Sequence, residues 1–164
     1  MNEGNMIILA EIDLPDLAAT QAVAARLAPL LRPGDVLAFD GTLGAGKTEF
    51  CRAMIHALGF ADDVPSPTFN LVQVYEPSPE DMTTPAIWHM DLYRLESPEE
   101  AFELGIEEAF DSAVSLIEWP AKLGPYLPEG FLTCRLEIMA DQGARKLTLI
   151  GDEQWRRRLG SILS

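Results

Sequence analysis

The chain is poor in cysteine and in basic residues, and it has no long hydrophobic run. Cys51 and Cys134, its two cysteines, lie far apart and show no metal-ligand spacing, so we expect two buried thiols in a cytosolic protein. No apolar run reaches the roughly 18 residues that a membrane-spanning helix needs. Residues 1–4 also lack the basic region of a secretory signal. These absences predict a soluble, cytoplasmic protein that makes no membrane contact.

Positive charge is the other scarce feature. Twelve Lys and Arg residues stand against 26 Asp and Glu residues, which gives a formal net charge of −14. Tight binding to a phosphate backbone needs clustered Lys and Arg, so this balance of charges argues against direct binding to nucleic acid. An acidic body can still hold one phosphate-rich ligand in a local pocket, or dock on a basic protein.

The length of 164 residues and a hydrophobic fraction of 48% predict a single domain over residues 1–164 and exclude wholesale disorder. Apolar patterns predict strands over residues 6–12, 36–39, 69–75, 87–92, 114–117, 132–138 and 146–150. They predict helices over 17–31, 47–58 and 153–163, and another that has Ser97 as its N-cap and stops at Gly105. The last two strands flank a turn and suit a hairpin.

The most specific signal is residues 41–48, which match G-x-x-x-x-G-K-[ST] in full, between a buried strand and a helix. Glycines let backbone N–H groups turn inward around phosphate oxygens, and the helix N-terminus adds partial positive charge. Lys47 would reach the β- and γ-phosphates, and the Thr48 hydroxyl would bind Mg²⁺. The expected nucleotide contacts are Gly41, Leu43, Gly44, Ala45, Gly46, Lys47, Thr48 and Glu49.

The choice of nucleotide follows from what accompanies this loop. No N-K-x-D segment of the kind that reads guanine is present, which favours ATP. A small-molecule kinase with such a loop normally closes an Arg-rich lid over the transferring phosphate. Residues 156–158 are the only run of arginines, and their place near the C-terminus is poor for a lid.

Two carboxylates follow predicted strands, where they are suited to binding the metal ion that accompanies the phosphates. Asp91 and Glu118 could each hold Mg²⁺, directly or through water, or orient the attacking water. Thr68, after Ser66 and Pro67, either senses the γ-phosphate in a switch segment or only begins a strand. Trp119 either contacts the base or fills the core.

The two histidines and a run of glutamates have plainer interpretations. His89 is interpreted as a packed strand residue and His56 as a helix-face residue, because neither has a partner at metal-ligand spacing. The acidic residues between 99 and 108 suit a solvated helix face or a surface that docks on a basic partner.

Taken in order, these motifs resemble the TsaE (YjeE) family, the ATPase component of bacterial threonylcarbamoyladenosine tRNA modification. Residues 41–48 look like its G-x-L-G-A-G-K-T loop, and residues 66–69 look like its S-P-T-F segment. Residues 89–95 resemble H-x-D-L-Y-R-L, and residues 117–120 resemble I-E-W-P. Residues 103–105 resemble its E-x-G element, and the likeness extends over residues 14–150.

The resemblance implies a three-layer P-loop α/β fold with a mixed, mainly parallel central sheet. It also implies weak ATP hydrolysis that is stimulated in a complex with TsaD and TsaB proteins, with tRNA reached only through that complex. Carried over by motif, the site residues are Lys47 for phosphate, Thr48 and Glu118 for Mg²⁺, Asp91 for catalysis, Thr68 in the switch-like segment and Trp119 near the nucleotide.

One position departs from the family pattern. Many relatives have Thr or Ser directly after the loop threonine, where this chain has Glu49. A hydroxyl there could bond the α-phosphate, whereas a carboxylate would be repelled by it. The repulsion is on the order of a few kcal/mol at most, so Lys47 and Mg²⁺ could still prevail.

Two other functions remain open from the residues alone. One is a free-standing P-loop kinase for a small metabolite, and the other is a nucleotide-gated binding module with negligible turnover. The poor placement of a lid argues against the kinase. The paired candidates Asp91 and Glu118 argue against the pure binding module.

Overall fold

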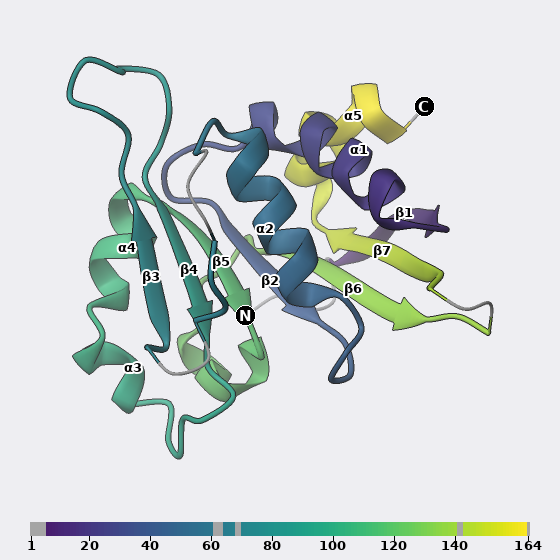
Figure 1. Ribbon diagram of the computed structural model, residues 1–164. Helices are drawn as coiled ribbons and strands as arrows, with labels where there is room; N and C mark the ends of the chain where they lie inside the picture. The colour runs from purple at the N-terminus through teal and green to yellow at the C-terminus, as the bar shows by residue number, and fades with distance from the viewer. Residues whose placement is uncertain (1–5, 61–63, 68–69, 141–142, 164) are drawn as a thin grey trace.

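Within residues 6–60, 64–67, 70–140 and 143–163, which the computed structural model describes, seven strands form one mixed sheet in the order β1-β7-β6-β2-β5-β4-β3 (Figure 1). The strands are β1 (Ile7–Leu14), β2 (Val36–Asp40), β3 (Val72–Tyr75), β4 (Ile87–Asp91), β5 (Val114–Glu118), β6 (Leu132–Ile138) and β7 (Arg145–Gly151). Strands β6, β2, β5 and β4 run parallel, while β7 and β1 on one side and β3 on the other pair antiparallel. The mixed sheet and the late β6–β7 hairpin confirm the sequence prediction.

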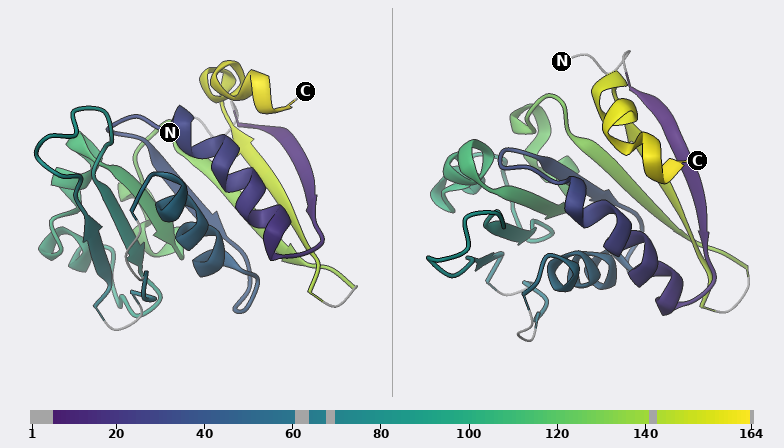
Figure 2. Two further views of the ribbon diagram at one scale, coloured as in Figure 1. Left: turned by 45° about the horizontal axis from the view of Figure 1, so that its top comes forward. Right: turned by 90° about the horizontal axis from the view of Figure 1, so that it is seen from above.

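Helices cover both faces of this sheet. Helices α1 (Leu17–Leu27) and α2 (Lys47–Ala57) lie side by side on one face, and α5 (Glu153–Leu163) packs on the same side (Figures 1 and 2). The opposite face is covered by α3 (Glu100–Glu103), α4 (Ile106–Ser112) and the 3-10 helix η3 (Pro120–Tyr126). The result is the three-layer arrangement expected from the sequence.

Strand β2 owes its unbroken apolar run to burial on both faces. Consecutive side chains of a strand point to opposite faces. Leu37 and Phe39 therefore join the cluster beneath α2, where Phe50 packs, and Val36 joins the cluster that contains Ile106 of α4. Because helices pack on both faces of the sheet, the position of β2 is fixed. The start of the loop that follows β2 is fixed with it.

The start of α1 is as predicted, but its end is not. Ala19 N donates to Asp16 Oδ1 at 2.9 Å, so Asp16 is the N-cap. The helix stops at Leu27 and continues as the short 3-10 helix η2 (Ala28–Leu30). Pro29 lies in this turn and offers no N–H for an α-helical hydrogen bond, which explains why the expected helix over 17–31 is too long.

The segment after β4 also differs in detail from the sequence prediction. The prediction that Ser97 is an N-cap is wrong. Helix α3 begins after Glu99 with no side-chain cap, and the Glu100 N–H donates to the Ser97 carbonyl. Gly105, at φ +83°, does end α3 as predicted, and α4 starts directly after it. Strand β3 begins at Val72, because Leu71 has a φ of +66° that an extended strand does not allow.

One arginine of α5, Arg158, attaches that helix to the rest of the fold. Arg158 donates to Asp35 Oδ1 at 2.9 Å and to Asp35 Oδ2 at 2.6 Å, and its guanidinium stacks on Trp155. Arg156 and Arg157 pair with Glu153. Because Asp35 precedes β2, these arginines lie by the opposite end of that strand from the phosphate loop.

None of the helices in the described part of the chain combines the length and the apolar character that crossing a membrane requires.

Candidate functional site

The phosphate loop joins the end of β2 to the start of α2 in a tightly packed turn. Gly41 has a φ of +150°, and a Cβ at this position would lie 2.5 Å from the Leu136 carbonyl oxygen, so only glycine fits beneath β6. Gly46 is the N-cap of α2 with a φ of +102°. Since glycine has no side chain to cap the helix, the first N–H groups of α2 remain for an anion.

Arg145, the first residue of β7, holds the outer side of this loop. Its Nε donates to the Ala45 carbonyl at 3.1 Å, and its Nη2 donates to the Gly44 carbonyl at 3.2 Å. In a trans peptide the C=O and the following N–H point in opposite directions. The Gly46 N–H therefore points away from Arg145, toward the inside of the loop. Sequence reasoning missed Arg145, because nothing local to the hairpin signals a contact about 100 residues away.

Lys47 is the first residue of α2, and its amine is already positioned beside the loop. Its Nζ donates to the Gly41 carbonyl at 2.7 Å and lies 3.4 Å from the centroid of the Trp119 ring. Burial lowers the pKa of Lys47 below its usual value, and the nearby carboxylates of Glu118, Asp91 and Asp40 oppose that shift. Those carboxylates favour the charged amine next to the place where phosphate would bind.

Trp119 owes its position to an unusual backbone conformation. Its φ of +60° is left-handed, which is rare for a residue with a large side chain. The ring lies over Lys47 and packs against Tyr93, with 5.0 Å between the two ring centroids. Trp119 therefore lies beside Lys47 and is half-buried rather than part of the core, while its contact with a nucleotide stays a prediction.

The two predicted carboxylates meet because their strands are parallel neighbours. Asp91 and Glu118 are aligned at the ends of β4 and β5, and both side chains are buried. Glu118 Oε1 accepts a hydrogen bond of 2.8 Å from Thr48 Oγ1, and Asp91 Oδ1 accepts one of 3.1 Å from the Tyr93 N–H. One cleft is lined by Leu43, Gly44, Gly46, Lys47, Thr48, Glu49, Ser66, Asp91, Glu118 and Trp119. Thr68 lies outside the described residues.

These groups suit a Mg²⁺ ion. Mg²⁺ prefers oxygen ligands and usually takes one or two carboxylates together with phosphate oxygens and water. The Thr48 hydroxyl donates its only hydrogen to Glu118, so its lone pairs remain for a cation. The donor set at the ends of β4 and β5 therefore fits the ion that the sequence predicts.

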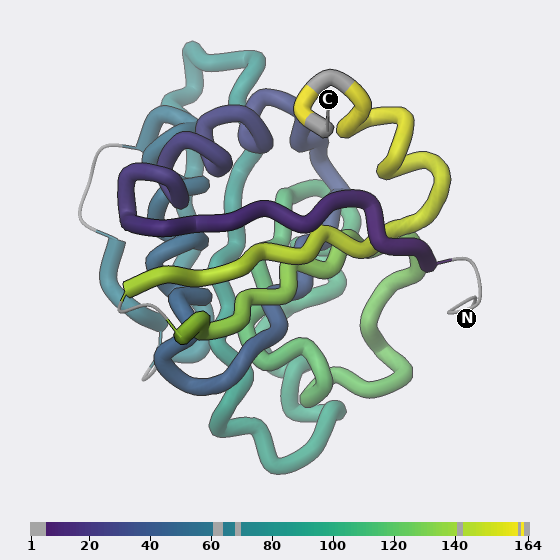
Figure 3. Tube along the Cα trace, turned by 90° about the vertical axis from the view of Figure 1, so that its right-hand side faces the viewer, coloured from purple at the N-terminus to yellow at the C-terminus, as the bar shows by residue number. Residues whose placement is uncertain are grey.

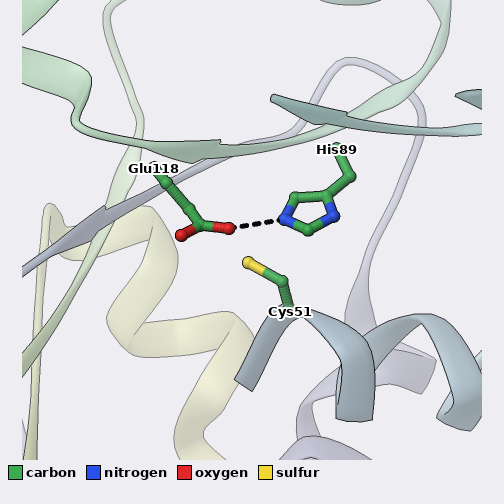
Figure 4. Close-up of side chains that lie close together, drawn as sticks. All are labelled: Cys51, His89 and Glu118. Atoms are coloured by element: carbon green, nitrogen blue, oxygen red, sulfur yellow. Dashed lines mark hydrogen bonds and ion pairs between the residues drawn. The ribbon is translucent and has the colours of Figure 1, made fainter. Parts of the chain in front are cut away.

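A buried cluster lies directly behind Glu118 (Figure 4). His89 Nε2 and Glu118 Oε2 are 2.7 Å apart, and the Cys51 thiol lies within 4.8 Å of both groups. All three side chains are buried. Burial, together with the charge of the neighbouring carboxylates, raises the pKa of Cys51 well above its usual value. The interpretation of His89 as only a packed strand residue is incomplete. Side chains two residues apart on a strand point to the same face, so the sequence does indicate that His89 and Asp91 share a face of β4.

Glu49 is paired with a neighbour one turn along α2. Arg52 Nη1 donates to Glu49 Oε1, and Arg52 Nε donates to the Val64 carbonyl at 3.0 Å. Beyond Glu49 lies a second cavity, whose walls include the apolar side chains of Leu14, Leu17 and Leu136. It adjoins Ala45, Gly46 and Arg145, so the two cavities meet at the phosphate loop.

The chain is similar to known proteins in both sequence and fold. The family model described as threonylcarbamoyl adenosine biosynthesis protein TsaE matches residues 14–147. A protein named tRNA threonylcarbamoyladenosine biosynthesis protein TsaE from Rickettsia felis is 43% identical over 132 residues, which are 80% of this chain and 74% of the relative. A protein of the same name from Treponema pallidum is 37% identical over 121 residues, 73% of this chain and 84% of the relative. The crystal structure of YdiB from Bacillus subtilis superposes with a TM-score of 0.75 at 25% identity, over 96% of this chain and 95% of that one.

Proposed function

Since the chain belongs to the TsaE family, we propose that it is the ATP-binding and weakly hydrolysing component of the machinery that makes threonylcarbamoyladenosine (t6A) in tRNA. The observation that carries this proposal is the single cleft in which the phosphate loop, the Lys47 amine, the Thr48 hydroxyl and two buried carboxylates meet. Such a set of groups is typical of P-loop proteins that hydrolyse a nucleoside triphosphate.

The proposed reaction assigns each group a part. The loop N–H groups and the start of α2 bind the phosphates, and the Lys47 amine turns from the Gly41 carbonyl to the β- and γ-phosphate oxygens. Thr48 and Glu118 would hold Mg²⁺, which supplies neutralisation of charge on the phosphate oxygens. Asp91, aligned with Glu118, orients the attacking water or accepts its proton.

The cavity beyond Glu49 suits the base of the nucleotide. Its apolar side chains Leu14, Leu17 and Leu136 offer surface for a flat heterocycle. Since it opens beside Ala45 and Gly46, a nucleotide whose phosphates lie in the loop would place its base there. Trp119 borders the other side of the loop, next to the phosphates.

Docking on partner proteins would explain the excess of acidic residues in this chain. A formal charge of −14 disfavours direct binding of tRNA and favours docking on a basic surface. We therefore propose that TsaD and TsaB proteins are the partners, that they stimulate hydrolysis, and that tRNA is reached only through them in the cytoplasm.

Phosphate release separates this function from the two alternatives. We expect slow release from ATP and Mg²⁺ with the chain alone, and a clear increase when TsaD and TsaB are added. Transfer of the γ-phosphate to a small metabolite would instead identify a kinase. ATP binding without release in either condition would identify a binding module and contradict hydrolysis.

Replacing Glu49 by Thr is expected to tighten ATP binding. The change removes a carboxylate near the expected α-phosphate and supplies a hydroxyl. Because Arg52 already pairs with Glu49, the gain is limited to about tenfold, or about 1.4 kcal/mol. Isothermal titration calorimetry measures it. Glu49→Gln is the matched control for charge, and equal or weaker binding by both variants would contradict the prediction.

A further inference from the structure

The feature that the proposed reaction leaves unused is the buried His89 side chain. His89 is fully buried on β4, and its Nε2 lies 2.7 Å from Glu118 Oε2 (Figure 4). Burial of a polar ring is costly unless it is hydrogen-bonded. Thr48 Oγ1 donates to the same carboxylate, at 2.8 Å to Oε1 and at 3.1 Å to Oε2, so His89 and Thr48 share Oε2.

The hydrogen-bonding capacity of the ring shows which way this bond runs. A carboxylate only accepts, so His89 must present an Nε2–H to Glu118. Among the described residues His89 Nδ1 has no hydrogen-bond partner. An Nδ1–H would be a buried donor without an acceptor, which costs more than a bare ring nitrogen. The geometry therefore favours the tautomer that carries its hydrogen on Nε2.

We propose that His89 is a positioning residue that fixes the orientation of the Glu118 carboxylate for the divalent cation. This inference rests on the proposed function, because it concerns the ion bound with the nucleotide. The terminal torsion of a glutamate is broad, so the carboxylate needs fixed donors to hold one orientation. His89 Nε2 lies 2.7 Å from Oε2, and Thr48 Oγ1 lies 2.8 Å from Oε1 and 3.1 Å from Oε2, so donors from two elements hold the carboxylate at the edge of the cleft.

Cys51 raises a competing interpretation, in which the cluster itself binds a soft metal. One observation counts against it. A metal-bound histidine almost always donates its second ring N–H to an acceptor, and His89 Nδ1 has none among the described residues.

The test compares variants that differ in the donor to Glu118. In His89→Leu the N–H is lost, so we expect the affinity for Mn²⁺ in the presence of ADP, measured by electron paramagnetic resonance, to fall about 10- to 100-fold. ADP affinity in EDTA should change less than about twofold. His89→Gln, whose amide can donate to Glu118, should recover most of the loss. Cys51→Ala is the matched control: it alters the same buried cluster but leaves the His89–Glu118 bond, so its Mn²⁺ affinity should match that of the unaltered chain.

The outcomes are distinguishable. If the unaltered chain binds ADP with no dependence on the cation, the proposed function fails; if it does depend on the cation and His89→Leu matches it, only the positioning role fails. A Cd²⁺–thiolate absorption band that is lost in both Cys51→Ala and His89→Leu would identify a soft-metal site and overturn the proposal. Should His89→Leu not fold, the comparison is made between His89→Gln and His89→Met, which differ chiefly in the amide donor.

Discussion

Lys47→Ala is expected to lower ATP affinity by about 100-fold, or about 2.8 kcal/mol, and to abolish partner-stimulated phosphate release. Among the described residues that line the cleft beside the phosphate loop, Lys47 is the one with a cationic side chain. Its loss also removes the donor to the Gly41 carbonyl and the cation over Trp119, so the loop itself is less well held. Calorimetric titration with ATP and a phosphate-release assay with TsaD and TsaB measure the two effects.

The matched control for this change is Lys122→Ala. Lys122 lies on η3 and donates to the Leu95 carbonyl at 3.3 Å, outside the cleft. Lys122→Ala removes the same positive charge as Lys47→Ala, so any general effect of a more negative chain will appear in both variants. Undiminished stimulated hydrolysis in Lys47→Ala would overturn the assignment of the phosphate site.

Gly41→Ala is expected to destabilise the chain by about 2 to 4 kcal/mol and to eliminate nucleotide binding. Its φ of +150° is unfavourable for alanine, and the new Cβ would lie 2.5 Å from the Leu136 carbonyl oxygen and 3.2 Å from Ala45 Cβ. Backbone atoms of β6 cannot easily move, so the loop must shift and carry the Gly41 carbonyl away from Lys47.

Gly130→Ala separates the steric clash from backbone strain. Gly130 also has a positive φ, +80°, but a Cβ there meets nothing within 4 Å, so a loss of only about 1 kcal/mol is expected. Urea denaturation of both variants, with calorimetry on the folded proteins, makes the comparison. Equal stability of the two variants would show that the Leu136 contact does not restrict Gly41.

The parts of the site that the sequence predicted are those that depend on local order along the chain. The loop from Gly41 to Thr48 follows a strand directly and opens a helix, so its placement needs no knowledge of the remaining fold. Asp91 and Glu118 each end a strand, and parallel neighbours bring such ends to one edge of the sheet. Thr68 lies outside the described residues, so its switch role stays a prediction.

The residues that the sequence did not reveal act through contacts between distant elements. Arg145 reaches the phosphate loop from β7, and neither a motif nor a spacing connects the two. His89 meets Glu118 only because β4 and β5 are adjacent. Ser97 shows the converse error: its sequence satisfies a helix N-cap pattern, but the chain closes a backbone turn there instead. A local pattern that favours a cap therefore does not by itself fix where the helix begins.

The pairing of β1 with β7 has a consequence for how the chain is made. Leu14 pairs with Arg145, 131 residues later, and the two strands lie side by side although they come from opposite ends of the sequence (Figure 3). At a ribosomal rate of about 5–20 residues per second, β1 must wait roughly 7 to 26 s for its partner. Strand β7 also delivers the Arg145 guanidinium to the phosphate loop, so a nascent chain lacks this support until residue 145 has been made. Full support of the phosphate loop therefore depends on the same late step that pairs β1.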